Sequence, residues 1–455
     1  MSGQTWLPAS PVWAAWLATA MIAGAMIADL RHDVRRLISA RNVVLGGIFI
    51  WYLLEALKAG PAVMAYGSAA YEYGIFLVML GAGSFLVGYH RSDVKCFDGW
   101  ARRAIRLDDW EFRRNTLWVG ACIGLIPIVL FGLNDPVKTV RDVLGSRATW
   151  GGALGRGALG DFRAAVLMIE TFLLGVAWVA MLVLSDRRRT RGITFAAAAV
   201  LAWHLVRSYG TGTRSMIFLS VLVPAAWFYW HADERRQRVL AASAVPCALL
   251  FYWFAGAMVQ GRNEGRLDFG KAPTYVGHEM FRELLFIVDQ VPSKRPYLYG
   301  ETILIEAINP VPRFLWKDKP LGFGVTYAGW QGYDALAGGP TLSPGILGEM
   351  YVNFGLPGIA LLSLLGGAIC RAWDRIGPRS TDSMSVLMLY SLGLGNFLMM
   401  GRSFSITVFY PIFAAFISMA LVAWHLRRTS RAFDYRSWQP GSAGVAAGRW
   451  RGDGP

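Results

Sequence analysis

Long apolar runs, separated by short polar connections, dominate the pattern of this chain. Eleven runs are almost free of charged residues, and several approach the roughly 20 helical residues that cross a hydrocarbon core. A helix satisfies its own backbone hydrogen bonds in lipid, whereas the short alternating strands of a barrel do not occur in the sequence. The pattern therefore predicts an all-α, polytopic transmembrane bundle of about eleven spans, at 11–29, 42–57, 70–89, 115–133, 164–184, 193–207, 214–231, 239–259, 345–370, 384–400 and 404–426.

The spacing of these runs divides the chain into four parts. Residues 1–259 hold eight spans joined by short loops, and residues 345–426 hold the last three. Between them, residues 260–344 form one long loop, and long ordered loops are usually functional. The tail 427–455 is basic and ends in a Gly- and Arg-rich stretch with little to pack, so we expect it to be disordered. The N-terminus lacks the basic region of a signal peptide, so the first run is expected to be a retained span.

The positions of Lys and Arg predict the orientation of the spans. Alternate connections carry 27 of the 45 Lys and Arg residues, and the short connections near 58–70, 208–213 and 401–403 on the opposite side carry one, none and one. The positive-inside rule then places the N-terminus outside, the C-terminus in the cytoplasm and the long loop outside. The same bias explains the net charge of +15 without a nucleic-acid partner. The basic connections are 30–41, 90–114, 185–192, 232–238, 371–383 and the tail 427–455.

Only 16% of the residues are charged, below the quarter typical of soluble domains, so polar groups next to the spans are informative. The first such place is RSYGTGTRS at 207–215, where Arg207 and Arg214 bracket a Gly/Thr turn. Backbone amides at such a turn favour anions, and guanidinium groups pair with phosphate oxygens. This pattern is typical of a diphosphate site. Arginines that only reach from span ends to the interface give the same pattern.

The long loop is the second polar place. It contains GHEMFREL, in which a helix over 275–290 would put His278 and Arg282 on one face and Glu279 and Glu283 on another. Further on, three prolines in INPVPRFLWKDKPLGFG set the backbone before several cations, which suit phosphate, and a tryptophan, which offers a flat face to a sugar. A solvated loop without a function could carry similar charges. The candidates here are Arg313, Trp316, Lys317 and Lys319.

The third polar place is the start of the ninth span, in SPGILGEMYVNFGLPG. Glu349 and Asn353 are four residues apart and would share one side of a helix. A carboxylate in a span is costly unless it faces a polar cavity, although a hydrogen bond between helices would also explain it. Arg402, in the short connection after the tenth span, is expected at the same level. The four scattered cysteines have no metal or disulfide spacing, and there is no zinc signature, P-loop or dinucleotide fingerprint. No metal or cofactor is therefore expected.

NPVPRFLWKDKP, SPGILGEMYVNFGLPG and the GTRS that opens a span resemble segments of a known family. These are the bacterial oligosaccharide repeat-unit polymerases, or Wzy-type O-antigen and exopolysaccharide polymerases. The plan of many helices with one large late loop is also similar. The resemblance covers residues 200–426, and the first half of the chain resembles the family only in hydropathy.

This resemblance implies a membrane glycosyltransferase with a GT-C-like fold in the bacterial inner membrane. It implies a substrate carried on undecaprenyl diphosphate, polymerised at the periplasmic face without a nucleotide sugar, metal or other cofactor. A flippase and a chain-length regulator of the same pathway are implied as partners, besides the phospholipid bilayer. The residues that match the family's segments are Arg214, Arg313, Lys317, Lys319, Glu349 and Asn353.

The location of the remaining candidates adds roles to this expectation. Glu349, Glu279 or His278 would accept a proton from the attacking hydroxyl, while Arg214 would stabilise the departing diphosphate. The substrate-binding candidates are Arg207, Arg282, Arg313, Trp316, Lys317, Lys319, Asn353 and Arg402. Three alternatives remain: an O-antigen ligase that transfers glycan to lipid A core, a flippase for lipid-linked oligosaccharides, and a non-catalytic scaffold.

Overall fold

The computed structural model describes residues 12–32, 34–99, 189–210, 280–308, 318–333, 342–377 and 384–399, together with Trp316 and short stretches between 110 and 250. Every regular element in these residues is a helix, and none of them forms a strand. The prediction of a helical protein is confirmed at this level.

Four helical segments in this part of the chain are long and apolar enough to cross a membrane. They are Val12–Asp29 in α1 (Val12–His32), the continuous run Ala40–Lys58, α5 (Ser68–Arg91) and α17 (Gly345–Asp374). The run Ala40–Lys58 consists of α2 (Ala40–Ile48), a π-helical turn η2 (Phe49–Leu53) and α3 (Leu54–Lys58). These segments coincide with four of the spans expected from hydropathy.

Two further helices coincide with expected spans. These are α11 (Arg191–Gly210) and α18 (Met384–Met399), at the sixth and tenth runs. Spans 115–133, 164–184, 214–231, 239–259 and 404–426 lie wholly or largely outside the described residues, as does the tail 427–455. The count of eleven spans therefore stays a prediction.

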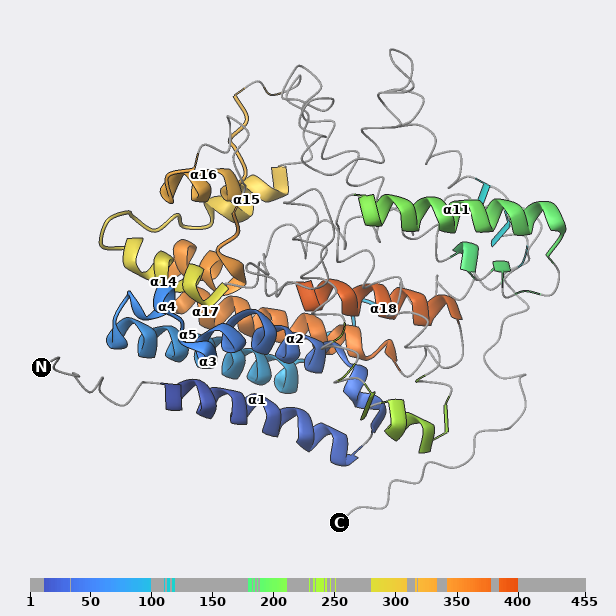
Figure 1. The fold of residues 1–455 in the computed structure, drawn as a ribbon, viewed down its shortest axis with the longest axis horizontal. Helices are drawn as coiled ribbons and strands as arrows, with labels where there is room; N and C mark the ends of the chain where they lie inside the picture. The colour runs from blue at the N-terminus through green and yellow to red at the C-terminus, as the bar shows by residue number, and fades with distance from the viewer. Residues whose placement is uncertain are drawn as a thin grey trace, which may run out of the picture.

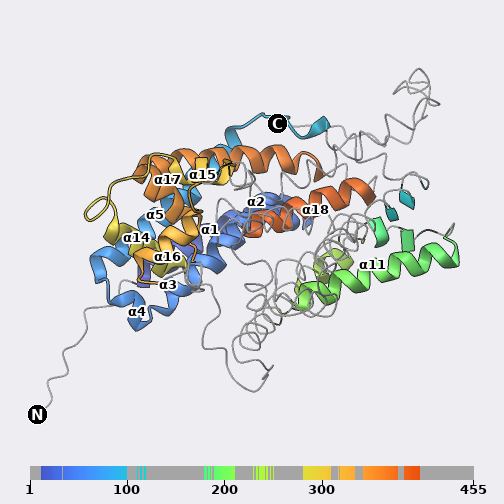
Figure 2. The same cartoon turned by 90° about the horizontal axis from the view of Figure 1, so that it is seen from above.

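Buried contacts of Asp374 fix the relative directions of the long helices. Its carboxylate, at the end of α17, accepts a hydrogen bond from Tyr89 near the end of α5, at 2.8 Å. It also accepts one from the backbone N–H of Ala40, at the start of α2, at 2.7 Å, and one from Tyr390 of α18, at 2.6 Å. α5 and α17 therefore run parallel, and α2 runs opposite to them, along the common axis seen in Figures 1 and 2. α18 runs in the direction of α2, because Leu398 near its end accepts a hydrogen bond from Trp51 of η2.

Glycines allow α5 and α17 to pack at close range. A Cβ on Gly88 would lie 1.9 Å from the carbonyl oxygen of Leu364, and one on Gly367 would lie 2.0 Å from that of Phe85. Small residues at such contacts let two membrane helices approach closely enough for extensive van der Waals packing. This pair forms the centre of the apolar core, which α2, α1 and α18 complete.

Three short helices of the long loop cover the end of the bundle opposite Asp374. They are α14 (Met280–Gln290), α15 (Glu301–Ile308) and α16 (Phe323–Trp330). In Figure 1 they gather at the end of the molecule where α3 and α4 (Pro61–Met64) also lie. We call this end of the bundle the α14 end, and the opposite one the Asp374 end. The loop thus has ordered structure of its own, and it includes the helix expected at 275–290, observed from Met280 onward.

α17 differs from the single continuous span expected at 345–370, because it is broken at Gly355. This residue has φ 63° and ψ −143°, which only glycine adopts readily, and Pro357 follows. A Cβ on Gly358 would lie 2.3 Å from the Met350 carbonyl oxygen, although residues eight apart in a helix are separated by about 12 Å along the axis. The Oγ of Ser363 lies 3.6 Å from the Sδ of Met350. Residues 345–354, here called the half-helix, therefore fold back against 356–374.

Candidate functional site

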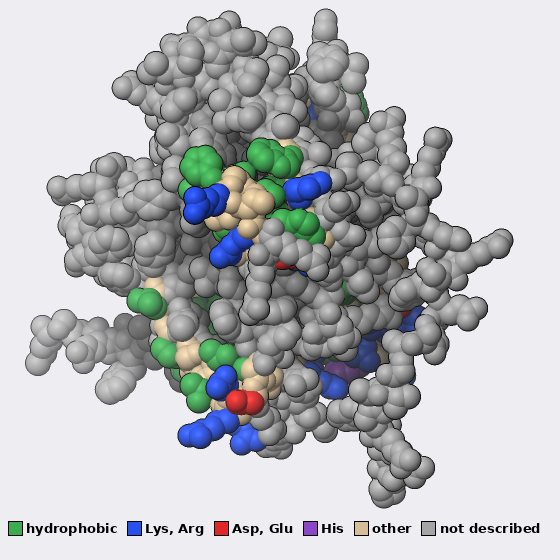
Figure 3. Space-filling model, turned by 90° about the vertical axis from the view of Figure 1, so that its right-hand side faces the viewer, with side chains coloured by type: hydrophobic (Ala, Val, Ile, Leu, Met, Phe, Trp, Pro, Cys, Tyr) green, Lys and Arg blue, Asp and Glu red, His purple; other side chains and the backbone are tan. Residues whose placement is uncertain are grey.

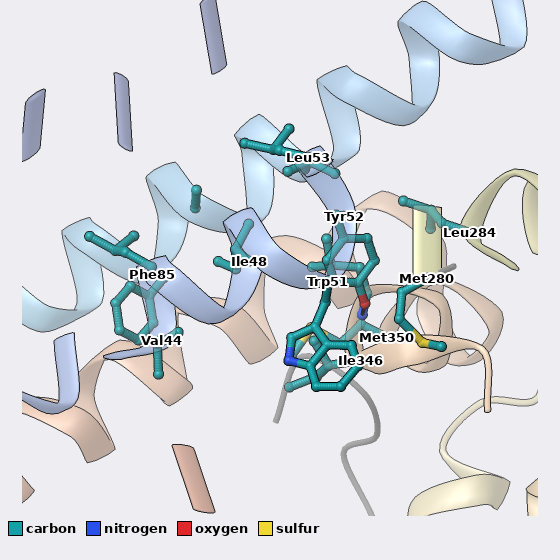
Figure 4. Packing of buried hydrophobic residues seen from close by; sticks show 14 of the residues in the cluster. Val44, Ile48, Trp51, Tyr52, Leu53, Phe85, Met280, Leu284, Ile346 and Met350 are labelled. Carbon is teal, nitrogen blue, oxygen red and sulfur yellow. Dashed lines mark hydrogen bonds between the residues drawn. The ribbon is translucent and has the colours of Figure 1, made fainter. Parts of the chain in front are cut away.

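Glu349 lies on the half-helix, inside the bundle. Its side chain is buried, with a relative exposure of 6% for the residue. The half-helix is held from one side by Tyr52, whose hydroxyl accepts a hydrogen bond from the backbone N–H of Leu347 at 3.0 Å. Tyr52 also lies within electrostatic range of Glu349. Figure 4 shows Trp51 and Tyr52 directed toward Ile346 and Met350 of the half-helix.

The π-helical turn explains how Tyr52 reaches this position. A π turn inserts a residue into a helix and changes the direction of the side chains that follow, and such turns are frequent at functional sites. Here the turn spans Phe49–Leu53. Trp51 donates from Nε1 to the carbonyl oxygen of Leu398 at 3.0 Å, while Tyr52 points to the half-helix. One turn thus joins α18 and the half-helix to the same segment.

Asn353 ties the half-helix to the long loop. Its amide nitrogen donates to Thr302 Oγ1 and to the carbonyl oxygen of Glu349, both at 2.7 Å. Its amide oxygen accepts from the N–H of Gly300 at 2.9 Å. Both amide hydrogens of this 1% exposed residue therefore have protein acceptors. The described contacts give Asn353 a positioning task, and its binding of substrate stays a prediction.

Glu55 caps α14, the first described helix of the loop. Its carboxylate accepts hydrogen bonds from the backbone N–H groups of Phe281 at 2.9 Å and Arg282 at 3.1 Å. The first N–H groups of a helix have no partner within it, and the helix dipole favours a negative charge there. The sequence analysis did not single out Glu55, because its partners are more than 200 residues away. The signal available was a lone carboxylate near the end of an apolar run.

Glu283 joins α14 to α16. Its Oε2 accepts from the Tyr327 hydroxyl and from Gln331 Nε2, both at 2.5 Å, and its Oε1 lies 3.0 Å from Nη2 of Arg282. Burial, and then the adjacent Glu283 carboxylate, raise the pKa of the Tyr327 hydroxyl well above its usual value. Burial and the same carboxylate also raise the pKa of Tyr66. These hydrogen bonds hold α14 and α16 together, and nothing in the local sequence pairs Glu283 with Tyr327.

The structure brings together only some of the residues expected from the sequence. Glu349, Asn353 and Arg282 lie at the α14 end. Lys319 is 4% exposed, whereas Trp316 is 42% exposed. Arg207 is on α11, which stands apart from α14, α15 and α16 in Figures 1 and 2, so the structure does not bring it to the half-helix. The remaining candidates lie outside the described residues: Arg214, His278, Glu279, Arg313, Lys317 and Arg402.

Among the described side chains, no group of three or more His, Cys, Asp or Glu residues could hold a metal ion. No family model, no curated protein and no solved structure matches this chain.

Proposed function

We propose that this chain is a membrane glycosyltransferase that polymerises undecaprenyl-diphosphate-linked oligosaccharide repeat units at the periplasmic face of the bacterial inner membrane. The observation that carries the proposal is the burial of Glu349 on a half-helix held by α14 and by the segment that leads into α15. Ile287 of α14 lies 3.6 Å from where a Cβ on Gly348 would be. A membrane segment retains a carboxylate inside a bundle at a high cost, and usually for function.

The proposed reaction joins two lipid-linked glycans. A hydroxyl of the incoming repeat unit attacks the anomeric carbon of the growing chain, and its proton passes to the carboxylate of Glu349. The new glycosidic C–O bond forms as the bond from the anomeric carbon to the diphosphate oxygen breaks. The lipid diphosphate leaves with the electron pair, and its growing charge is stabilised by cations. Two of these cations are described residues of the loop, Arg282 and Lys319. We propose that the others are Arg214, Arg313, Lys317 and Arg402.

The proposal includes an eleven-span, GT-C-like bundle with a periplasmic N-terminus and a cytoplasmic C-terminus. Two observations support this orientation. The helix directions set by Asp374 alternate as the spans require. Figure 3 faces the right-hand side of Figure 1, away from α14 to α16, and shows several groups of Lys and Arg side chains there. Basic residues mark the cytoplasmic side.

Reconstitution tests the proposal. Purified protein in proteoliposomes is given lipid-linked repeat units, and the products are separated by size. A ladder of longer glycans is expected. Transfer to added lipid A core would instead indicate a ligase, and movement of the substrate across the bilayer without a new bond would indicate a flippase. Either of these results, without a ladder, would overturn the proposal.

Glu349→Gln tests the assigned role with little change of shape. Loss of a general base typically costs 10²- to 10⁴-fold, so we expect polymer formation to fall by at least about 100-fold. Arg214→Ala is expected to abolish long polymer as well, with normal insertion. Asp289→Asn is the matched control, because this carboxylate lies nearby on α14 of the long loop but is exposed and paired with Lys294. Polymer at the normal rate from Glu349→Gln would remove Glu349 from the mechanism.

A further inference from the structure

A chain of aromatic rings leads from the flank of α5 to the surface of the long loop. Tyr73 of α5 lies within electrostatic range of Tyr351 of the half-helix. The ring centroids of Tyr351 and Tyr297 are 6.2 Å apart, and those of Tyr297 and Tyr299 are 6.3 Å apart. Tyr351 is only 5% exposed, whereas Tyr299 is 76% exposed. The rings thus form one connected set, here called the tyrosine strip, that runs from the interior to the solvent.

The outer part of the strip is attached to the half-helix by backbone hydrogen bonds. The N–H of Leu298 donates to the carbonyl oxygen of Val352 at 2.9 Å, and that of Tyr299 donates to the carbonyl oxygen of Asn353 at 3.0 Å. The last carbonyl groups of a helix have no partner within it, so these bonds cap the C-terminal end of the half-helix. A ligand on the tyrosines would therefore contact the same rigid unit that carries Glu349.

Tyr299 has a backbone conformation that tyrosine rarely adopts. Its φ is 46°, in the left-handed region, and Gly300 follows with φ 91°. Such a conformation is strained in a bulky residue and concentrates at functional sites. Here it leaves the ring in solvent, and Tyr297 is its one described ring partner. Packing does not explain why this residue is strained and exposed at once.

A membrane-interface belt is the ordinary explanation for tyrosines near the end of a bundle. A belt follows the lipid-facing periphery, whereas the tyrosine strip turns inward to Tyr351, two residues after Glu349. The segment from Tyr297 to Gly300 carries no charged residue. Uncharged aromatic faces with hydroxyl groups at their edges suit a sugar ring, which has an apolar C–H face and polar edges. They do not suit a diphosphate.

We propose that Tyr297 and Tyr299 bind a saccharide ring of the glycan, as a subsite beside the half-helix that carries Glu349. The identity of this glycan as the lipid-linked repeat unit rests on the proposed function. The subsite holds the sugar ring by stacking. Asn353 couples the position of the subsite to that of the half-helix.

Binding of free glycan tests the subsite independently of turnover. The probe is the oligosaccharide released by mild acid from lipid-linked intermediates of the native membrane, and its contact with purified protein is measured by saturation-transfer NMR. Tyr299→Ala is expected to weaken binding about 3- to 10-fold, as expected for the loss of one aromatic contact. Tyr299→Phe retains the ring and is expected to keep most of the affinity. Tyr333→Ala is the matched control, because Tyr333 is an exposed tyrosine of the same loop outside the strip.

In the polymerase assay, Tyr299→Ala should raise KM by a similar factor with kcat nearly unchanged, the pattern for lost substrate binding. Equal glycan affinity of Tyr299→Ala and the wild type, or an equal loss in Tyr333→Ala, would overturn the subsite. So would a wild type that binds no released glycan. Binding that depends on Tyr299 without any polymer would leave the subsite standing and refute the polymerase. Polymer formation by Tyr299→Ala with the wild-type KM would leave the polymerase standing and refute the subsite.

Discussion

At the scale of single residues, buried carboxylates hold the described part of the molecule together. Asp374 accepts four hydrogen bonds, from two phenol groups and from the N–H groups of Ala40 and Arg41. It thereby caps α2 from another helix, in addition to the local cap by Ser39. A buried charge is stabilised only when its lone pairs are satisfied, and here the donors come from three other helices.

Replacement of Asp374 tests this role. Asp374→Ala leaves Tyr89 and Tyr390 without their acceptor, and we expect the free energy of unfolding to fall by about 2–4 kcal/mol. The measurement is thermal or chemical unfolding in detergent. Asp93→Asn is the control at the same end of the bundle. Its carboxylate side chain is 81% exposed, and its ion pair with Arg375 holds the pKa of Asp93 below the usual value. No measurable change in stability is expected there, because solvent screens an exposed ion pair. Equal stabilities of Asp374→Ala and Asp93→Asn would contradict the role.

At the scale of elements, the contact between α5 and α17 depends on which glycine faces the partner helix. Gly366 and Gly367 are neighbours, but a Cβ on Gly366 would meet nothing within 4 Å, whereas one on Gly367 would lie 2.0 Å from the Phe85 carbonyl oxygen. We expect Gly367→Ala to force the helices apart and to cost about 1–3 kcal/mol. Gly366→Ala should be neutral or slightly stabilising. Unfolding of the two variants side by side is the measurement, and similar midpoints would argue against the close packing.

The break in α17 is the second prediction at this scale. Gly355 has a positive φ, and a Cβ there would lie 2.9 Å from the Tyr297 hydroxyl oxygen. Gly355→Ala is therefore expected to destabilise the fold-back by about 1–3 kcal/mol and to lower activity, because the half-helix that carries Glu349 would shift. Gly83→Ala in α5, where a Cβ has open space, is the control and should retain activity. Unfolding midpoints and polymer yield are measured together, and wild-type values for Gly355→Ala would refute the strained turn.

At the scale of the whole molecule, the helix directions lead to a prediction about topology. In a background with Cys122 and Cys247 replaced by serine, the remaining described cysteines are the exposed Cys96 and the buried Cys370. A membrane-impermeant maleimide should label Cys96 only after the inner membrane is opened. It should label Ser293→Cys, on the exposed loop, as soon as the outer membrane alone is made permeable. Partial desolvation of the thiol raises the pKa of Cys96, so its labelling should accelerate as the pH rises. Labelling of Cys96 before the inner membrane is opened, with Ser293→Cys protected, would contradict the proposed orientation.

Hydropathy was sufficient to locate the four long apolar helices of the described part. Val12–Asp29, Ala40–Lys58, Ser68–Arg91 and Gly345–Asp374 lie close to spans expected from apolar runs, because lipid allows a helix and little else. The sequence also indicated that Glu349 and Asn353 share one element. Neither Glu55 nor Glu283 could be assigned in this way, since their partners are distant in the chain and a single sequence holds no trace of those contacts.

The sequence by itself determined that the described part is helical and where its four long apolar helices lie, because these follow from local apolar length. The polarity of the two ends, which follows from charge, stays a prediction. Only the tertiary structure decided that α17 folds back at Gly355, that α5 and α17 meet through glycines, and that Glu349 lies next to Tyr52. Gly355 and Pro357 are residues that weaken a helix, but whether the chain breaks there and where it then goes depend on what it packs against. The same holds for the tyrosine strip, whose rings come from three separate segments and become one surface only after folding.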